Sequence, residues 1–251
     1  MGELPVVAVL GDSVATSLGL PESRGHWPSV IRASRPGLRV VSFAKVASQI
    51  TDSAARIDEI IAASPSMVVV AHGGRECLLR TTSALRLIKT DPHLPLTATP
   101  RGVVRGARRA VYRRVLNELT GERRRVLTPL MRLRPNLDAA RFADLFDEIM
   151  SAVLDRTDAP VIVLIPHGHA MGFHPWSTAA VAAVQEHMRV WGDRDARVTV
   201  VDTGDEFASD ASAYQFDGVH FSPDGHRRVA QALLEALDGV VQTPAQPNGD
   251  W

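Results

Sequence analysis

The sequence has little that would favour a disulfide-linked, nucleic-acid-binding or membrane-spanning protein. A single cysteine among 251 residues, Cys77, excludes an intramolecular disulfide and a zinc cluster built on cysteines, and is best interpreted as a small buried thiol. Twenty-eight basic residues balance 28 acidic ones, so net charge indicates neither nucleic acid nor membrane as a partner. The N-terminus has no basic leader and only a short apolar run, which favours a cytoplasmic protein.

What the sequence does contain is a regular alternation of strand-like and helix-like segments. Short apolar runs predict buried strands at Val6–Leu10, Leu38–Phe43, Met67–Ala71, Val161–Ile165 and Val198–Val201. Helices are predicted at Trp27–Ser34, Asp52–Ala63, Ala139–Leu154, Ser177–Trp191 and Pro223–Leu237. This alternation predicts an α/β fold whose mostly parallel sheet is covered on both faces, with the ligand crevice beyond the carboxyl ends of the strands.

We expect one domain over residues 1–240, a loose C-terminal tail over 241–251, and an insertion at about 79–135. Eleven arginines fall between Arg101 and Arg134, against only Glu118 and Glu122. The stretch is interpreted either as a solvated helical insertion or as a lid or docking surface for an anionic substrate, an acyl carrier or a coenzyme.

The first candidate for chemistry is Gly11-Asp12-Ser13, directly after the first predicted strand. A serine at this point directs its hydroxyl into the crevice, and its own backbone N–H can stabilise an oxyanion. The residues from Val14 to Leu18 suit a helix whose positive end favours a developing anion. By itself the tripeptide is also compatible with a serine that caps a strand-to-helix turn.

The second candidate is Asp217-Gly218-Val219-His220, just before the last predicted helix. A serine nucleophile needs a base, histidine has a suitable pKa, and a carboxylate three residues earlier can orient the imidazole from the same loop. Ser222 and Pro223 suit the N-cap and first position of the helix that follows.

Together the two motifs resemble the pattern of the SGNH (GDSL) hydrolases. This resemblance covers the core of the chain, from about Val6 to Leu237. The resemblance implies a flavodoxin-like three-layer α/β/α sandwich and an acyl-transfer activity with Ser13 as nucleophile, His220 as base and Asp217 as its orienting acid. The implied acyl-transfer mechanism requires no metal and no organic cofactor. The separate acid and histidine loops and the Gly-x-Ser-x-Gly elbow of α/β-hydrolases are absent.

Two further blocks of the family are altered in this chain. The glycine that donates a backbone N–H to the oxyanion corresponds to Ala47, and the asparagine donor corresponds to Arg75. The resemblance therefore implies an oxyanion hole made of Ser13, Ala47 and Arg75. Arginine brings several donors and a full charge, and Glu76 is expected either to hold the Arg75 guanidinium in the site or to form a structural ion pair with it.

Several residues near these blocks are candidates for substrate contacts. They are Asp12, His72, Gly74, Glu76, His167 and His169. His72 is equally compatible with a satisfied core position. The cluster of His167, His169 and His174 has no HExxH spacing, so a loop facing the substrate is favoured over a metal site.

These observations predict a serine esterase that hydrolyses a small-molecule carboxylic ester, such as an acetylated sugar or metabolite. Two alternatives stay open: an acyltransferase that uses an acyl carrier or coenzyme A as donor, and a non-catalytic binding protein of the same fold.

Overall fold

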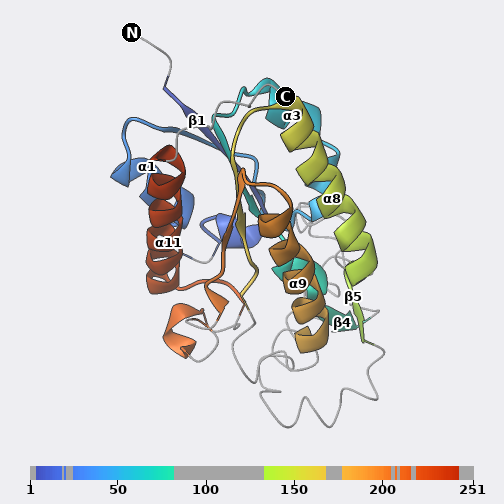
Figure 1. The fold of residues 1–251 in the computed structure, drawn as a ribbon. Helices are drawn as coiled ribbons and strands as arrows, with labels where there is room; N and C mark the ends of the chain where they lie inside the picture. Colours follow the sequence, from blue (N-terminus) through green and yellow to red (C-terminus); the bar gives the residue numbers. More distant parts are fainter. Residues whose placement is uncertain are drawn as a thin grey trace, which may run out of the picture.

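The structure is a computed structural model that describes residues 4–18, 20, 25–81, 133–167, 177–204, 207, 210–215 and 219–242. Its centre is a five-stranded parallel sheet with the strand order β2-β1-β3-β6-β7 (Figure 1). The strands are β1 (Val6–Gly11), β2 (Arg39–Ser42), β3 (Met67–Ala71), β6 (Val161–Leu164) and β7 (Val198–Val201). Each agrees with its predicted strand to within one residue at either end.

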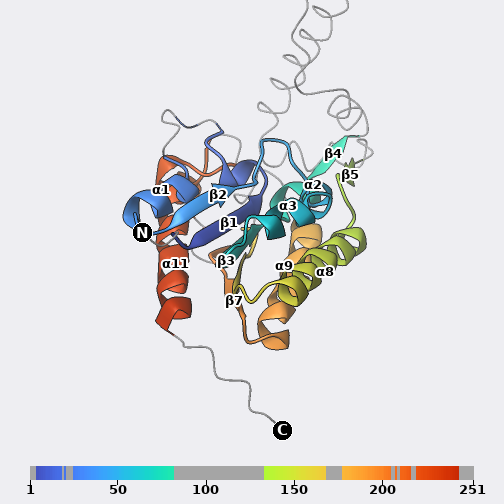
Figure 2. The same ribbon diagram turned by 90° about the horizontal axis from the view of Figure 1, so that it is seen from above.

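Helices cover both faces of this sheet (Figures 1 and 2). On one face lie α1 (Trp27–Ser34) and α11 (Pro223–Gln242), and on the other lie α2 (Ile50–Ala54), α3 (Ile57–Ala62), α8 (Ala139–Arg156) and α9 (Thr178–Arg194). The three-layer sandwich predicted from the sequence is confirmed.

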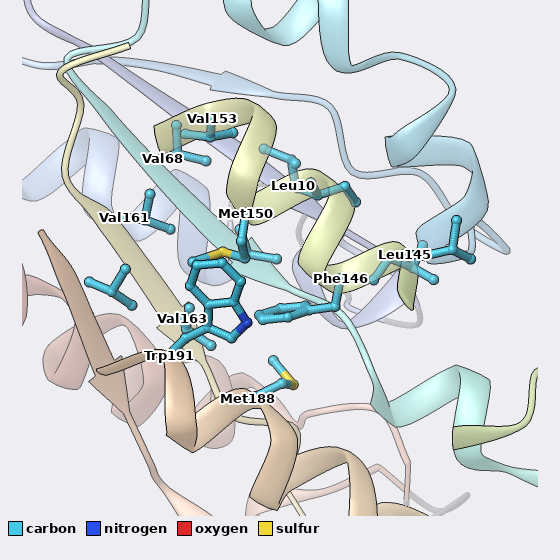
Figure 3. Packing of buried hydrophobic residues seen from close by; sticks show 14 of the residues in the cluster. Leu10, Val68, Leu145, Phe146, Met150, Val153, Val161, Val163, Met188 and Trp191 are labelled. Atoms are coloured by element: carbon cyan, nitrogen blue, oxygen red, sulfur yellow. The ribbon is translucent and has the colours of Figure 1, made fainter. Parts of the chain in front are cut away.

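Alternating side chains of the central strand separate the two hydrophobic layers. Val7 and Val9 of β1 belong to the layer under α1 and α11, whereas Ala8 and Leu10 belong to the layer under α8 and α9. Successive side chains of a strand point to opposite faces, so a strand covered on both faces has to be apolar at every position. Figure 3 shows the second layer, where Leu10 lies near Phe146 and the other labelled side chains of α8.

Two of the predicted helices differ most from the structure. The single helix expected over Asp52–Ala63 is divided into α2 and α3, because Arg56 leaves helical geometry and its guanidinium is held by Glu59 and the Phe43 carbonyl. The helix expected to end at Leu237 continues to Gln242, two residues into the predicted tail. The rest of that tail lies outside the described residues.

A pair of short antiparallel strands bounds the predicted insertion. In this pair, β4 (Leu79–Thr81) is hydrogen-bonded to β5 (Leu133–Pro135), with Thr81 opposite Leu133. Residues 82–132, which carry all but one of the arginines of the basic stretch, lie outside the described residues. In the part of the chain that is described, no helix is long and apolar enough to cross a membrane.

The strand order determines where a site can form. From β1 the chain first adds β2 on one side and then β3 on the other, so the strand order reverses between β1 and β3. In such folds the loops that follow these two strands diverge and leave a crevice at their carboxyl ends. Asp12 and Ser13 follow β1, and residues 72–75 follow β3. The sequence motifs therefore meet at this point of the sheet.

Candidate active site

The candidate nucleophile, Ser13, begins a single 3-10 turn, η1 (Ser13–Ala15). Asp12 caps this turn, since its Oδ1 accepts a hydrogen bond of 2.8 Å from the Val14 N–H. The indole N–H of Trp27 donates to the Val14 carbonyl and fixes the turn to α1. The chain is extended again at Thr16, so the longer helix expected after Ser13 is wrong.

The candidate base is brought to Ser13 across 207 positions of the sequence. His220 Nε2 lies 2.9 Å from Ser13 Oγ, which is hydrogen-bond distance. The His220 carbonyl accepts from the Gln215 N–H, and Ser222 caps the start of α11 by accepting from the Gly225 N–H, as predicted. The third member of the predicted triad, Asp217, lies outside the described residues.

A buried histidine supports the loop that carries His220. His167 follows β6, its Nε2 donates to the Val219 carbonyl at 3.1 Å, and its ring lies against Phe221 with centroids 4.2 Å apart. Burial lowers the pKa of His167 to about 4, so the ring stays neutral near pH 7. His167 was expected to face the substrate, but its ring is 5% exposed and contacts the residue before the candidate base. His169 and His174 lie outside the described residues.

The loop after β2 contains the predicted backbone donor, Ala47, in an unusual conformation. Its φ of 71° lies in the left-handed region that favours glycine. At this position the chain thus adopts with alanine a backbone conformation that glycine adopts more readily. Beside this loop is a cavity of about 320 Å³ whose walls include Phe43, Lys45, Ala47 and Ser53.

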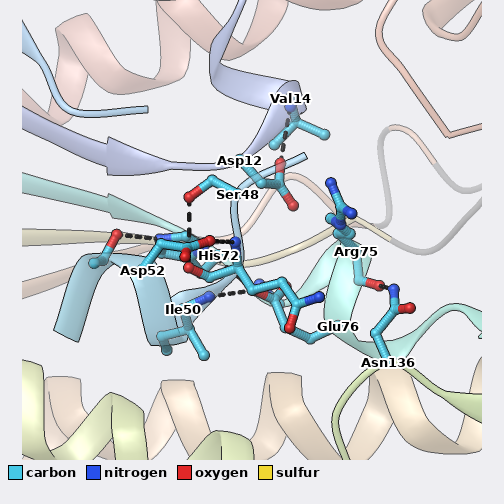
Figure 4. A network of polar contacts seen from close by, with 12 residues as sticks. Asp12, Val14, Ser48, Ile50, Asp52, His72, Arg75, Glu76 and Asn136 are labelled. Carbon is cyan, nitrogen blue, oxygen red and sulfur yellow. Dashed lines mark hydrogen bonds and ion pairs between the residues drawn. The ribbon is translucent and has the colours of Figure 1, made fainter. Parts of the chain in front are cut away.

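Arg75, the predicted side-chain donor, lies in the short helix α4 (Gly74–Cys77). It is 8% exposed, and its Nε has no hydrogen-bond partner. In Figure 4 its guanidinium points to the side on which Asp12 lies, away from Asn136, whose amide donates to the Arg75 carbonyl. A buried guanidinium N–H without a partner is suited to an anionic group of a substrate.

Glu76 does not hold Arg75, so both expected forms of that ion pair are wrong. Its carboxylate instead accepts from the backbone N–H groups of Ile50 and Gly73, and His72 Nδ1 lies 3.4 Å from it. Burial opposes ionisation of Glu76, but the contact with His72 and the backbone donors outweigh it and lower the pKa.

The other predicted substrate contacts near these blocks are buried as well. Asp12 is 0% and His72 is 1% exposed, and Gly74 is buried, so they offer a substrate almost no surface. Burial, and then the charge of Glu76, raises the pKa of Asp12 to about 6. His72 Nε2 pairs with Ser53 Oγ at 2.8 Å, a contact that no local motif in the sequence indicates. Burial also raises the pKa of Cys77 to about 12, which fits an unreactive thiol.

Comparison with known proteins agrees with this geometry. The family model of the GDSL-like lipase/acylhydrolase family matches residues 9–228, and the chain therefore belongs to that family as an SGNH-type hydrolase. A search of the curated proteins gives no match.

Solved structures share the fold at low sequence identity. TesA superposes with a TM-score of 0.60 at 14% identity, covering 94% of this chain and 99% of that one. For the lipase/acylhydrolase from Enterococcus faecalis the TM-score is 0.60 at 14% identity, covering 97% and 100%. A catalytic mutant of the acetylxylan esterase Axe2 from Geobacillus stearothermophilus gives 0.60 at 14%, covering 94% of each chain.

The backbone at position 47 gives a first prediction. Ala47→Gly removes the cost of a left-handed alanine, about 1–2 kcal/mol, and adds about 0.4–1 kcal/mol of unfolded-chain entropy. We expect the free energy of unfolding to stay equal or rise by up to about 1.5 kcal/mol in denaturant titrations. Ala55→Gly, at φ −65°, is the matched control and should lower it by about 0.5–1 kcal/mol. Equal losses in both variants would contradict the strain at Ala47.

His226 gives a second prediction, on stability against pH. Burial, and then the charges of neighbouring histidines, lowers its pKa to about 3, so the folded state stays unprotonated while the unfolded state binds a proton below about pH 6.5. Stability is therefore lost as the pH falls from about 6.5 towards 3. The variant His226→Asn keeps an acceptor for the backbone N–H of Trp27. Between pH 7 and pH 5 it should lose about 2 kcal/mol less unfolding free energy than the wild-type chain. An unchanged pH dependence in urea titrations would refute this.

Proposed function

We propose that the chain is a serine esterase that hydrolyses a small carboxylic ester, with Ser13, His220 and Asp217 as its triad. The observation that carries the proposal is the 2.9 Å contact between His220 Nε2 and Ser13 Oγ at the switch point of the sheet. A nucleophile within hydrogen-bond reach of a base is the arrangement that serine acyl transfer requires.

In this mechanism Ser13 Oγ attacks the ester carbonyl while His220 takes its proton, and Asp217 orients the imidazole. The backbone N–H groups of Ser13 and Ala47, together with Arg75, stabilise the negative oxygen of the tetrahedral intermediate. His220 returns the proton to the departing alcohol. A water molecule, deprotonated by the same ring, then releases the acid and restores Ser13.

The activities for which two structural neighbours are named support an ester as substrate. These neighbours are a lipase/acylhydrolase and an acetylxylan esterase. An acetylated sugar or metabolite therefore remains the substrate class that we favour.

The arginine-rich stretch supports a second candidate, an acyltransferase. Its eleven arginines against two acids suit a phosphorylated donor such as coenzyme A or an acyl carrier. Release of product from p-nitrophenyl esters of increasing chain length, with and without an acceptor alcohol, separates the two. A faster release with the alcohol, together with the new ester, would favour the transferase.

Covalent labelling tests the nucleophile and the enzyme itself. A fluorophosphonate should label the wild-type chain on Ser13, and Ser13→Ala should abolish the label, as measured by intact mass. Ser29→Ala is the matched control, because Ser29 is also buried and its Oγ lies 3.4 Å from a histidine ring nitrogen, His26 Nε2. Absence of label in the wild-type chain would favour a non-catalytic binding protein.

Arg75 gives a separate prediction for the oxyanion hole. Arg75→Ala should lower kcat/KM for p-nitrophenyl acetate by about 100- to 1,000-fold, as for other lost oxyanion donors. Arg75→Asn, which installs the family's donor, should recover part of that loss. Turnover at the wild-type rate in both variants would exclude a catalytic role for this side chain.

A further inference from the structure

Glu76 makes contacts that the mechanism above leaves unexplained. Its side chain is 0% exposed, and its two carboxylate oxygens accept separate hydrogen bonds. Oε1 lies 2.7 Å from the backbone nitrogen of Ile50, and Oε2 lies 3.0 Å from the backbone nitrogen of Gly73 (Figure 4 shows Glu76 beside Ile50). The two peptide groups are 23 positions apart, so one buried carboxylate joins two distant parts of the chain.

Each of these peptide groups lies in or next to a segment that carries a proposed oxyanion donor. We call these segments the Ala47 loop (residues 43–49) and the Arg75 loop (residues 72–77). Ile50 begins α2 immediately after the loop that contains Ala47, and Gly73 precedes the short helix that contains Arg75. The first loop leaves β2 and the second leaves β3. In the sheet β1 lies between these two strands, so no ladder hydrogen bond connects them. Glu76 therefore supplies a link that the sheet does not.

The link matters because one loop has a strained residue, Ala47, and the other has a turn that only glycine fits. Ala47 has φ 71° and Gly73 has φ 112°. A side chain at Gly73 would lie 2.9 Å from Pro166 and Val184 atoms, so this turn is tightly packed as well as left-handed. Strained conformations persist only where the surrounding contacts hold them.

The chemistry of the contact requires a carboxylate. Both partners of Glu76 are N–H donors, and only an ionised carboxylate offers an acceptor to each, since an amide would turn its NH₂ group towards one of them. The His72 ring lies beside this carboxylate: its Nε2 pairs with Ser53 Oγ at 2.8 Å, and its Nδ1 lies 3.4 Å from Glu76 Oε1. This contact favours the charged state of Glu76.

We propose that Glu76 is a positioning residue that holds the Ala47 loop and the Arg75 loop at the separation required by the oxyanion. The proposal rests on the esterase function proposed above. Oxyanion donors act at about 2.7–3.1 Å, and a misplacement of about 1 Å costs on the order of 100-fold in rate. A weakened link should therefore reduce stabilisation of the transition state more than binding of the ester.

The experiment compares Glu76→Gln with Glu59→Gln. The control makes the same chemical change at an exposed carboxylate paired with Arg56 in the neighbouring helix α3. For p-nitrophenyl acetate we expect kcat of Glu76→Gln to fall about 100-fold with KM changed by less than about 3-fold. Affinity for a trifluoromethyl ketone, which forms a tetrahedral oxyanion on Ser13, should fall by the same factor as kcat. Glu59→Gln should retain all three values.

A purely structural role gives a different result. Glu76→Gln would then unfold at lower temperature but keep the wild-type kcat and ketone affinity, and this outcome overturns the proposal. Glu76→Asp tests whether the length of the side chain matters as well as its charge. Aspartate keeps the charge but is one methylene too short to bind both N–H groups. We expect this variant to lose kcat as well, and wild-type kcat in a folded Glu76→Asp variant also overturns the proposal.

If neither Glu76 variant folds, amide hydrogen exchange of the wild-type chain tests the proposal instead. Binding of the ketone should then slow exchange at Ile50 and Gly73 together, and slowing at only one of them overturns the proposal. A failure of the proposed esterase function can be told apart from a failure of this proposal. In the first case the wild-type chain itself shows no Ser13-dependent labelling or turnover, whereas in the second only the comparison of the variants gives the unexpected result.

Discussion

The position of β1 in the sheet is the constraint on which the rest of the structure depends. β1 pairs with β2 on one side and with β3 on the other, and its side chains alternate between two hydrophobic layers. The loops from all three strands can therefore meet only beyond its carboxyl end. There the sheet provides no further backbone pairing, and side chains have to make the connections that bring Ser13, the Ala47 loop and the Arg75 loop together.

These connections are made by buried polar groups, whose burial is costly unless each finds a partner. Two carboxylates, an imidazole and a guanidinium lie close to one another at the switch point: Asp12, Glu76, His72 and Arg75. The two carboxylates differ in their donors. Glu76 receives two backbone N–H bonds and ionises readily, whereas Asp12 receives one, leaves an oxygen without a partner and holds its proton to about pH 6. Two acids with different proton affinities can thus coexist in one buried cluster.

The sequence predicts the sheet well and the surroundings of the site less well. The strands are rich in valine, and β1, β3 and β6 are apolar throughout, apart from the glycine that ends β1, a pattern that predicts them without knowledge of their neighbours. Ser13 and His220 are found because each belongs to a short local motif. The partners of Glu76 are different: they are backbone groups, and no side-chain pattern indicates which peptide N–H a buried carboxylate will bind. The same holds for His167 and Val219, and for Ser53 and His72, whose pairing depends on the packing of loops from separate strands.

The pairing of β4 with β5 has a consequence for how this chain could have acquired its basic segment. Thr81 and Leu133 are opposite one another, so the two ends of the stretch between them lie side by side. Whatever residues 82–132 contribute, the path of the core on either side does not depend on their length. Such a junction allows a segment to be gained, exchanged or lost between related proteins while the sheet and the serine–histidine pair remain as they are.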